Sequence, residues 1–335
     1  MASHLIPPIY AAFVWWFSTG AVLLLVGRSG RFGLLRIGCA TGLLAASLSG
    51  LALTANDTGI AAAYTAFTST IMLWGAQEIT FLAGWVTGPR PQPCPAGATG
   101  VRRLSLALQA ILYHELALLT CGAAILALTW NGANQIGFWT FVALWVLRQS
   151  AKINLFLGVP VTNDELMPDA VRFLKSYFAR KSVSVFFPVS VTLATAVLVI
   201  MIQRVVEVAA TPFDVVGLTL VSTLFALGVV EHWFMLLPMP AMKLWGWGMR
   251  SGFSREDTTM EQKPEIKPSN VRPNLVVLAI HRSEPMPAKS PAACARQRLE
   301  DQFRKGFIEQ HTTGDLATAL NIGVEPAATI KGRTS

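Results

Sequence analysis

Charged residues are scarce in this sequence. Asp, Glu, Lys and Arg together make up 14% of its 335 residues, whereas hydrophobic residues make up 53%. Soluble domains carry about 25% charged residues, so the deficit excludes an ordinary soluble protein and predicts a chain that lies largely within a membrane. The basic residues fall in short loops between apolar segments, where membrane topology and anionic lipid explain them. Nucleic-acid binding therefore has no support.

Cysteine and known catalytic motifs are also lacking. The four cysteines form no Cys-x-x-Cys pair, and we expect reduced thiols because all four fall in segments predicted to lie in membrane or cytosol. The chain contains no G-x-S-x-G, no Walker lysine motif, no G-x-G-x-x-G and no H-E-x-x-H, which are the common signatures of hydrolases, nucleotide-binding proteins and zinc proteases. We expect no enzymatic activity, with an intramembrane metal site left open below.

Long apolar stretches take the place of these motifs. A helix that crosses a bilayer needs about 20 mostly apolar residues. The stretches that qualify predict an all-α membrane protein with about seven transmembrane helices, at residues 6–27, 33–54, 60–86, 104–129, 135–157, 185–207 and 213–237. No basic region precedes the first stretch and no cleavage site follows it, so we interpret it as a retained helix and not a signal peptide.

Arginine and lysine fall in alternate loops of this predicted bundle. The second, fourth and sixth loops contain none, whereas the others and the segment after the last helix contain Arg28, Arg31, Arg36, Arg90, Arg102, Arg103, Arg172, Lys175, Arg180, Lys181, Lys243, Arg250 and Arg255. Because cytoplasmic loops are enriched in Lys and Arg, the N-terminus is predicted to be periplasmic and the C-terminus cytoplasmic.

The composition changes near residue 251, so that residues 1–250 form the predicted membrane domain. Prolines and charges are frequent in residues 251–335 and no stretch there is apolar enough to span a bilayer. We predict a mostly disordered cytoplasmic tail. Within it, Leu299, Phe303 and Phe307 recur at helical spacing and suggest a short amphipathic helix over 296–310, with a partner-binding helix as the alternative interpretation.

Ionisable and polar side chains occur inside four of the predicted helices, at similar depth in the cytoplasmic half of the bilayer. They form a predicted polar cluster: Glu78, His114, Glu115, Arg148, Lys152, Asn154, Glu231 and His232. Charges within a bilayer are costly and call for a partner or a function. Three carboxylates face two cations, so interhelical salt bridges that orient the bundle are the first interpretation.

A metal site is the second interpretation of the cluster. Di-iron bundles use Glu-x-x-His pairs that share one helix face, but here histidine and glutamate are adjacent in the pairs 114–115 and 231–232. Adjacent side chains point about 100° apart on a helix. One ligand from each of three helices, Glu78, His114 and His232, still permits an intramembrane metalloenzyme.

A tetrapyrrole site is the third interpretation, because a neutral imidazole can ligate the central metal of a macrocycle. A small residue one turn earlier leaves room for the ring, and Ala110 precedes His114 as Gly228 precedes His232. These two histidines are the candidate pigment ligands. A proton path ranks below the metal and tetrapyrrole sites, since the outer half of the bundle has almost no ionisable residues.

Several segments resemble, in order, those of the photosynthetic complex assembly protein 2 family (PuhE). They are Leu112-Tyr-His-Glu-Leu-Ala-Leu-Leu119, Ser150-Ala-Lys-Ile-Asn-Leu-Phe-Leu-Gly-Val-Pro160, Arg172-Phe-Leu-Lys-Ser-Tyr-Phe178, Phe187-Pro-Val-Ser-Val-Thr192 and Glu231-His-Trp-Phe234. The resemblance covers about residues 5–250. Two departures are Val161-Thr-Asn163 and the tail from residue 251, for which the family implies no role.

The resemblance implies a factor that assembles the photosynthetic reaction centre and core light-harvesting complex and affects bacteriochlorophyll supply or handover. Members of this family come from phototrophic bacteria and are encoded beside the gene for the reaction-centre H subunit. The expected partners are therefore reaction-centre and core-antenna subunits, together with membrane lipid. The expected location is the bacterial inner membrane or its intracytoplasmic photosynthetic extension. The family carries no established catalytic residues. A structural or regulatory protein held by salt bridges alone remains the alternative.

Overall fold

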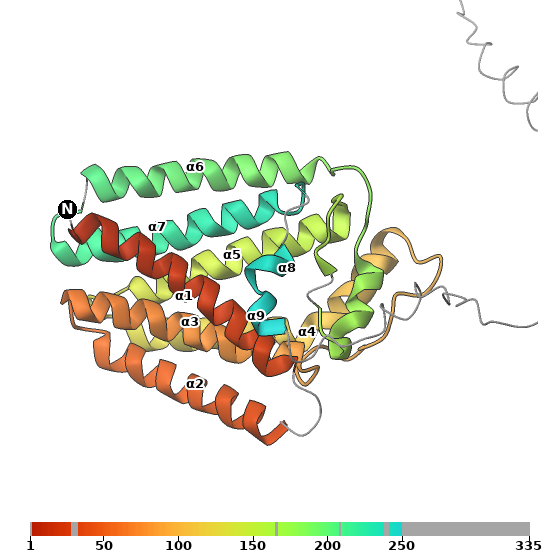
Figure 1. The fold of residues 1–335 in the computed structure, drawn as a ribbon, viewed down its shortest axis with the longest axis horizontal. Helices are drawn as coiled ribbons and strands as arrows, with labels where there is room; N and C mark the ends of the chain where they lie inside the picture. The colour runs from red at the N-terminus through yellow and green to blue at the C-terminus, as the bar shows by residue number, and fades with distance from the viewer. Residues whose placement is uncertain (1, 28–32, 165–166, 208, 238–240, 250–335) are drawn as a thin grey trace, which may run out of the picture. The chain divides into compact units, whose positions relative to one another are not determined.

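The computed structural model describes residues 2–27, 33–164, 167–207, 209–237 and 241–249, and every regular element within them is helical (Figure 1). The long helices are α1 (Ala2–Val26), α2 (Gly33–Thr54), α3 (Ile60–Leu82), α4 (Gly100–Thr129), α5 (Ile136–Leu157), α6 (Phe186–Glu207) and α7 (Pro212–Trp233). The 3-10 helix η3 (Asp169–Tyr177) lies between α5 and α6, and the short helices α8 (Ala241–Leu244) and α9 (Gly246–Met249) follow α7. The predicted tail and its helix over 296–310 lie outside the described residues.

Five of the described helices are long and apolar enough to cross a membrane: α1, α2, α4, α6 and α7. The sequence predicts seven spans. The two remaining predicted spans correspond to α3 and α5, which have 23 and 22 residues and so match the others in length. Both carry charged residues in their second half, Glu78 in α3 and Arg148 and Lys152 in α5.

Helix ends follow local signals. Helix α3 ends at Leu82, four residues before the predicted end of the apolar stretch, and Gly84 just beyond it has φ of +78°. This left-handed conformation is typical of helix C-termini and suits glycine. Helix α7 begins with a capping box between Thr211 and Asp214, with Pro212 in the first turn, and both features favour a helix start.

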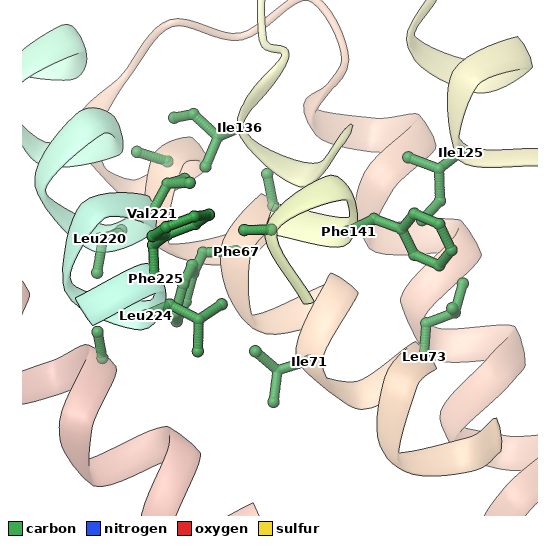
Figure 2. Packing of buried hydrophobic residues seen from close by; sticks show 14 of the residues in the cluster. Phe67, Ile71, Leu73, Ile125, Ile136, Phe141, Leu220, Val221, Leu224 and Phe225 are labelled. Atoms are coloured by element: carbon green, nitrogen blue, oxygen red, sulfur yellow. The ribbon is translucent and has the colours of Figure 1, made fainter. Parts of the chain in front are cut away.

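The centre of the bundle is formed by α3, α5 and α7, which all pack against one another. Helix α7 buries 56% of its apolar window, whereas α4 and α6 each bury 17% and form the periphery. Figure 2 shows the core between the central helices, where Phe67 of α3 and Phe225 of α7 lie among aliphatic side chains. The polar groups buried beside this core are hydroxyls such as that of Thr70, which donates to the Gly137 carbonyl at 3.1 Å, whereas the charged residues lie elsewhere along the helices.

The loops meet at the two ends of the bundle. At one end the backbone N–H of Asn134 donates to the carbonyl of Ala55 at 2.9 Å. At the other end the loops 83–99 and 158–185 meet, where the Tyr177 hydroxyl donates to the Gln92 carbonyl at 3.0 Å. The N–H of Val161 also donates to the carbonyl beyond α7, on Met235, at 3.0 Å. The ends of α3, α5 and α7 therefore lie together, beside the basic loops.

One carboxylate organises the loop between α5 and α6. Asp164 accepts a hydrogen bond from the Thr162 hydroxyl at 2.6 Å, forms an ion pair with Lys175 at 3.3 Å and is also bonded by Arg180. Burial by itself raises the pKa of this carboxyl, but the hydrogen bonds from Thr162, Arg180 and Lys175 outweigh burial and lower the pKa from 3.8 to about 2.

Candidate functional site: a polar hub at the end of α5

The last three turns of α5 carry five polar residues within the seven positions 148–154. We call this set the α5 hub: Arg148, Gln149, Ser150, Lys152 and Asn154. A helix turns about 100° per residue, so these side chains point in several directions around α5. Because α5 is a central helix, the hub reaches α3, α4, α6 and α7.

The first contact joins α5 to α3. A guanidinium nitrogen of Arg148 lies 3.2 Å from Glu78 Oε2. The Glu78 side chain is largely buried, at 13% exposure, whereas that of Arg148 is 41% exposed. The other carboxylate oxygen of Glu78 is buried and has no hydrogen-bond partner in the structure. The salt bridge therefore leaves part of the carboxylate unsatisfied.

The second contact joins α5 to α4 through two hub residues. Gln149 donates from Nε2 to Glu115 Oε2 at 2.7 Å, and Lys152 forms an ion pair with the other oxygen of the same carboxylate. Gln149 and Lys152 are three residues apart and so share one helix face. Glu115 is therefore bonded through both oxygens.

The third contact joins α5 to α7 through the ring of His232. His232 Nδ1 lies 2.7 Å from the Gly228 carbonyl, and Nε2 lies 2.9 Å from the Ser150 hydroxyl. A carbonyl only accepts, so Nδ1 carries the proton and Nε2 accepts from the hydroxyl. Both ring nitrogens of His232 are thus engaged, and ligation of a metal would break the bond to Ser150.

The fourth contact joins α5 to α6. Asn154 is fully buried, and its amide nitrogen donates to the Ser190 hydroxyl at 3.0 Å and to the Ser150 carbonyl at 3.0 Å. Its side-chain oxygen has no partner in the structure. Peripheral α6 is thereby held by a hydrogen bond at the level of the hub.

The charged residues form separate bonded pairs that lie close enough to interact electrostatically. Lys152 interacts electrostatically with Arg148 and Glu78 in addition to Glu115. Glu231 of α7 interacts with Arg148 and Glu78 and accepts a hydrogen bond from the Trp15 indole at 2.9 Å. Charged residues of four helices therefore interact, and Trp15 adds α1 to the group.

His114 lies in a different environment from His232. Its side chain is fully buried, its ring stacks on Phe81 at 4.1 Å between centroids, and neither ring nitrogen has a hydrogen-bond partner in the structure. The loop 83–99 covers α4 beside it. A Cβ at Gly88 would clash with the Gln109 carbonyl oxygen and lie 2.7 Å from the carbonyl carbon of Ala110. The helix face one turn before His114 is therefore closed.

The structure separates several residues that the sequence groups together. Within the described part of the chain, no group of three or more His, Cys, Asp or Glu residues lies close enough to hold a metal ion. The predicted ligands Glu78, His114 and His232 thus do not assemble. Sequence reasoning missed Gln149, Ser150 and Trp15. The run of polar residues at 148–154 within an apolar helix was the available signal for the first two.

These observations define an all-helical protein with several helices suited to a membrane and with charges paired between helices. Residues 1–256 match the family model described as "Protein of unknown function (DUF3623)", and the chain belongs to this family. It is similar to the "Uncharacterized 30.4 kDa protein in puhA 5'region" of Rhodobacter capsulatus, with 38% identity over 256 residues that cover 75% of this chain and 93% of that protein. No solved structure matches the chain.

Proposed function

We propose that this protein is a membrane-bound assembly factor for the photosynthetic reaction centre and core light-harvesting complex. The observation that carries the proposal is the 38% identical relative, whose name places it in the puhA 5' region. The segments that resemble the PuhE family support the same role, since that family is encoded beside the gene for the reaction-centre H subunit. The corresponding location is the inner membrane of a phototrophic bacterium.

The proposal includes seven membrane spans with the N-terminus outside and the C-terminus in the cytoplasm. Helices α3 and α5 are central and pack against other helices, and their charged residues pair across helices, which is how such residues are tolerated in a membrane. The basic residues Arg90, Lys175 and Arg180 belong to the two loops that meet at one end of the bundle, and Arg103 in the first turn of α4 donates to the Tyr177 carbonyl at the same end. This end is the cytoplasmic one under the positive-inside rule.

The α5 hub gives this factor a rigid frame. Peripheral helices α4 and α6 leave most of their apolar surface exposed, which suits contact with lipid and with the membrane helices of reaction-centre and core-antenna subunits. In this mechanism the hub fixes the relative positions of five helices. The exposed faces of α4 and α6 contact the reaction-centre and core-antenna subunits transiently while these subunits assemble.

Bacteriochlorophyll handover is the further step of the proposal, and His114 is the better candidate ligand. A neutral imidazole supplies one axial nitrogen to the central metal of such a pigment. Neither ring nitrogen of His114 has a hydrogen-bond partner among the described residues, but the loop 83–99 covers the helix face beside this ring. Both ring nitrogens of His232 are hydrogen-bonded. Binding at His114 requires Phe81 and the loop 83–99 to move aside.

Two experiments test the proposal separately. Deletion of the gene in a phototrophic host should lower reaction-centre and core-antenna absorbance, and complementation with the full chain should restore both. Unchanged spectra and unchanged pigment totals would contradict the assembly role. Purification in mild detergent from a pigment-making host tests handover, which fails if no tetrapyrrole co-purifies, whatever the deletion shows.

A structural or regulatory role is the second candidate function. It is favoured by the pairing of Glu78 with Arg148 and of Glu115 with Lys152, because interhelical bonds account for these charges without any ligand. Separate substitution of His114 and His232 distinguishes this role from pigment binding, because loss of accumulation indicates a structural role and loss of co-purified tetrapyrrole indicates a pigment ligand.

A further inference from the structure

A furrow runs along the outer face of α4. It has a volume of about 260 Å³ and is lined by Val101, Leu104, Ser105, Leu108, Gln109 and Leu112. The leucines and Val101 are exposed, and only 17% of the apolar window of α4 is buried. From Arg102 to Leu112 the helix rises about 15 Å. This rise is about half of the 30 Å hydrocarbon core. The furrow therefore matches the depth of one leaflet.

The chemistry of the furrow changes with depth. Arg102 flanks the end of the furrow that is nearest the start of α4. The helical turn of about 100° per residue places Arg102 on nearly the same face of α4 as Gln109. Ser105 and Gln109 follow one and two turns deeper, and Gln109 Nε2 donates to the Ser105 hydroxyl at 3.2 Å. Leu104, Leu108 and Leu112 form the apolar side. Arg102 comes first along this face, Ser105 lies about one turn deeper, and Leu108 and Leu112 lie deeper still, while Leu104 and Gln109 lie at intermediate depths.

Arg102 is available for a ligand, unlike its neighbour. It is exposed and has no hydrogen bond or ion pair with any other residue that the structure describes. Arg103, by contrast, lies over the Phe156 ring at 4.2 Å and donates to the Tyr177 carbonyl. The loops at this end of the bundle carry further basic residues, so the local field favours an anion.

We propose that this furrow binds an anionic phospholipid. The lipid phosphate pairs with Arg102, the glycerol ester region lies beside Ser105, and one acyl chain packs along Leu108 and Leu112. Arg102, Ser105 and then Leu108 and Leu112 follow one another in the same order as the phosphate, glycerol and acyl chain of a phospholipid, and the exposed arginine complements the negative charge. This inference requires α4 to lie in a bilayer and is independent of any role in assembly.

The test uses the full chain in nanodiscs that contain equal amounts of phosphatidylglycerol and phosphatidylcholine, with retained lipid counted by native mass spectrometry. We expect preferential retention of phosphatidylglycerol. Arg102→Gln should weaken this retention about fivefold, which is the effect of one surface cation on an anionic lipid. Arg102→Lys should keep most of it.

Two further variants complete the test. Arg172→Gln is the matched control, because Arg172 is an exposed arginine of η3 that is paired with Asp169 and does not line the furrow. Leu108→Trp fills the furrow without a change in charge and should also lower retention. Equal retention of the two lipids would show annular lipid only and overturn the proposal, as would equal losses in Arg102→Gln and Arg172→Gln or full retention in Leu108→Trp. Thermal unfolding of each variant establishes that it is folded.

Discussion

The hydroxyl of Ser150 on α5 lies 2.9 Å from Nε2 of His232 on α7. This hydrogen bond joins two helices of the bundle centre, and together with the Gly228 carbonyl it sets the tautomer of the imidazole. His114 has no such partner although it is equally deep in the protein. The two histidines that the sequence presents as equivalent ligands thus differ in what they contribute to the fold.

Ser150→Ala should lower the stability of the bundle by about 1 kcal/mol, the usual size of one interhelical hydrogen bond or one buried unsatisfied group. The reason is that Nε2 of His232 would lose its donor. Thermal unfolding in detergent measures the effect. Ser222→Ala is the control, because the Ser222 hydroxyl is buried on α7 without a partner, and it should be neutral or stabilising. Equal effects of both variants would contradict the role of the Ser150 bond.

Lys152→Met should destabilise the protein by about 3 kcal/mol, since it leaves the carboxylate of Glu115 buried without its cation. The double variant Glu115→Gln with Lys152→Met should recover a large part of this loss, because no buried charge is then left unpaired. Unfolding midpoints of the wild type, both single variants and the double variant form a complete cycle. Additive losses would show that the two residues act independently.

Gly88→Ala should destabilise the protein strongly, because its new Cβ would clash with the backbone of α4 at Gln109 and Ala110. Gly42→Ala is the matched control. A Cβ at Gly42 meets no atom within 4 Å, and Gly42 lies inside α2, where alanine is favoured over glycine by about 1 kcal/mol. Comparison of unfolding midpoints tests the close approach of the loop 83–99. Similar midpoints in both variants would rule it out.

The Asp164 network should make stability depend on pH in the acid range. The pKa of this carboxyl falls from its ordinary value of 3.8 to about 2 in the folded protein. The folded state thus favours the charged form, and the stabilisation is complete above pH 3.8 and lost as pH falls toward about 2. The difference in unfolding midpoint between the wild type and Asp164→Asn should shrink over this window. A difference that stays constant would disprove the linkage.

His114→Leu and His232→Leu should separate ligand binding from structure. His232→Leu removes two hydrogen bonds and should lower accumulation in the membrane. His114→Leu removes none that the structure contains and should accumulate normally. If His114 is the pigment ligand, its variant loses co-purified tetrapyrrole and assembly activity while the protein level stays unchanged. Normal accumulation with full activity would leave His114 without a functional role.

The helices are largely readable from the sequence. The structure begins or ends most of them within a few residues of the predicted ranges, and the exceptions have local causes such as Gly84 at the end of α3. Apolar length and helix-ending residues act locally along the chain. The position of each polar residue along its helix is readable for the same reason.

The contact partners of the polar residues are not readable from the sequence. Glu231 and His232 are adjacent in the sequence, yet one contacts Trp15 on α1 and the other Ser150 on α5. The turn of about 100° between them sends each toward a different neighbour. Which neighbour stands there depends on the rotation and packing of whole helices, and one sequence does not contain that information. The sequence alone thus determined a helical membrane protein with a polar layer. Only the tertiary structure decided that α5 is the hub of this layer and that His114 and His232 have separate environments.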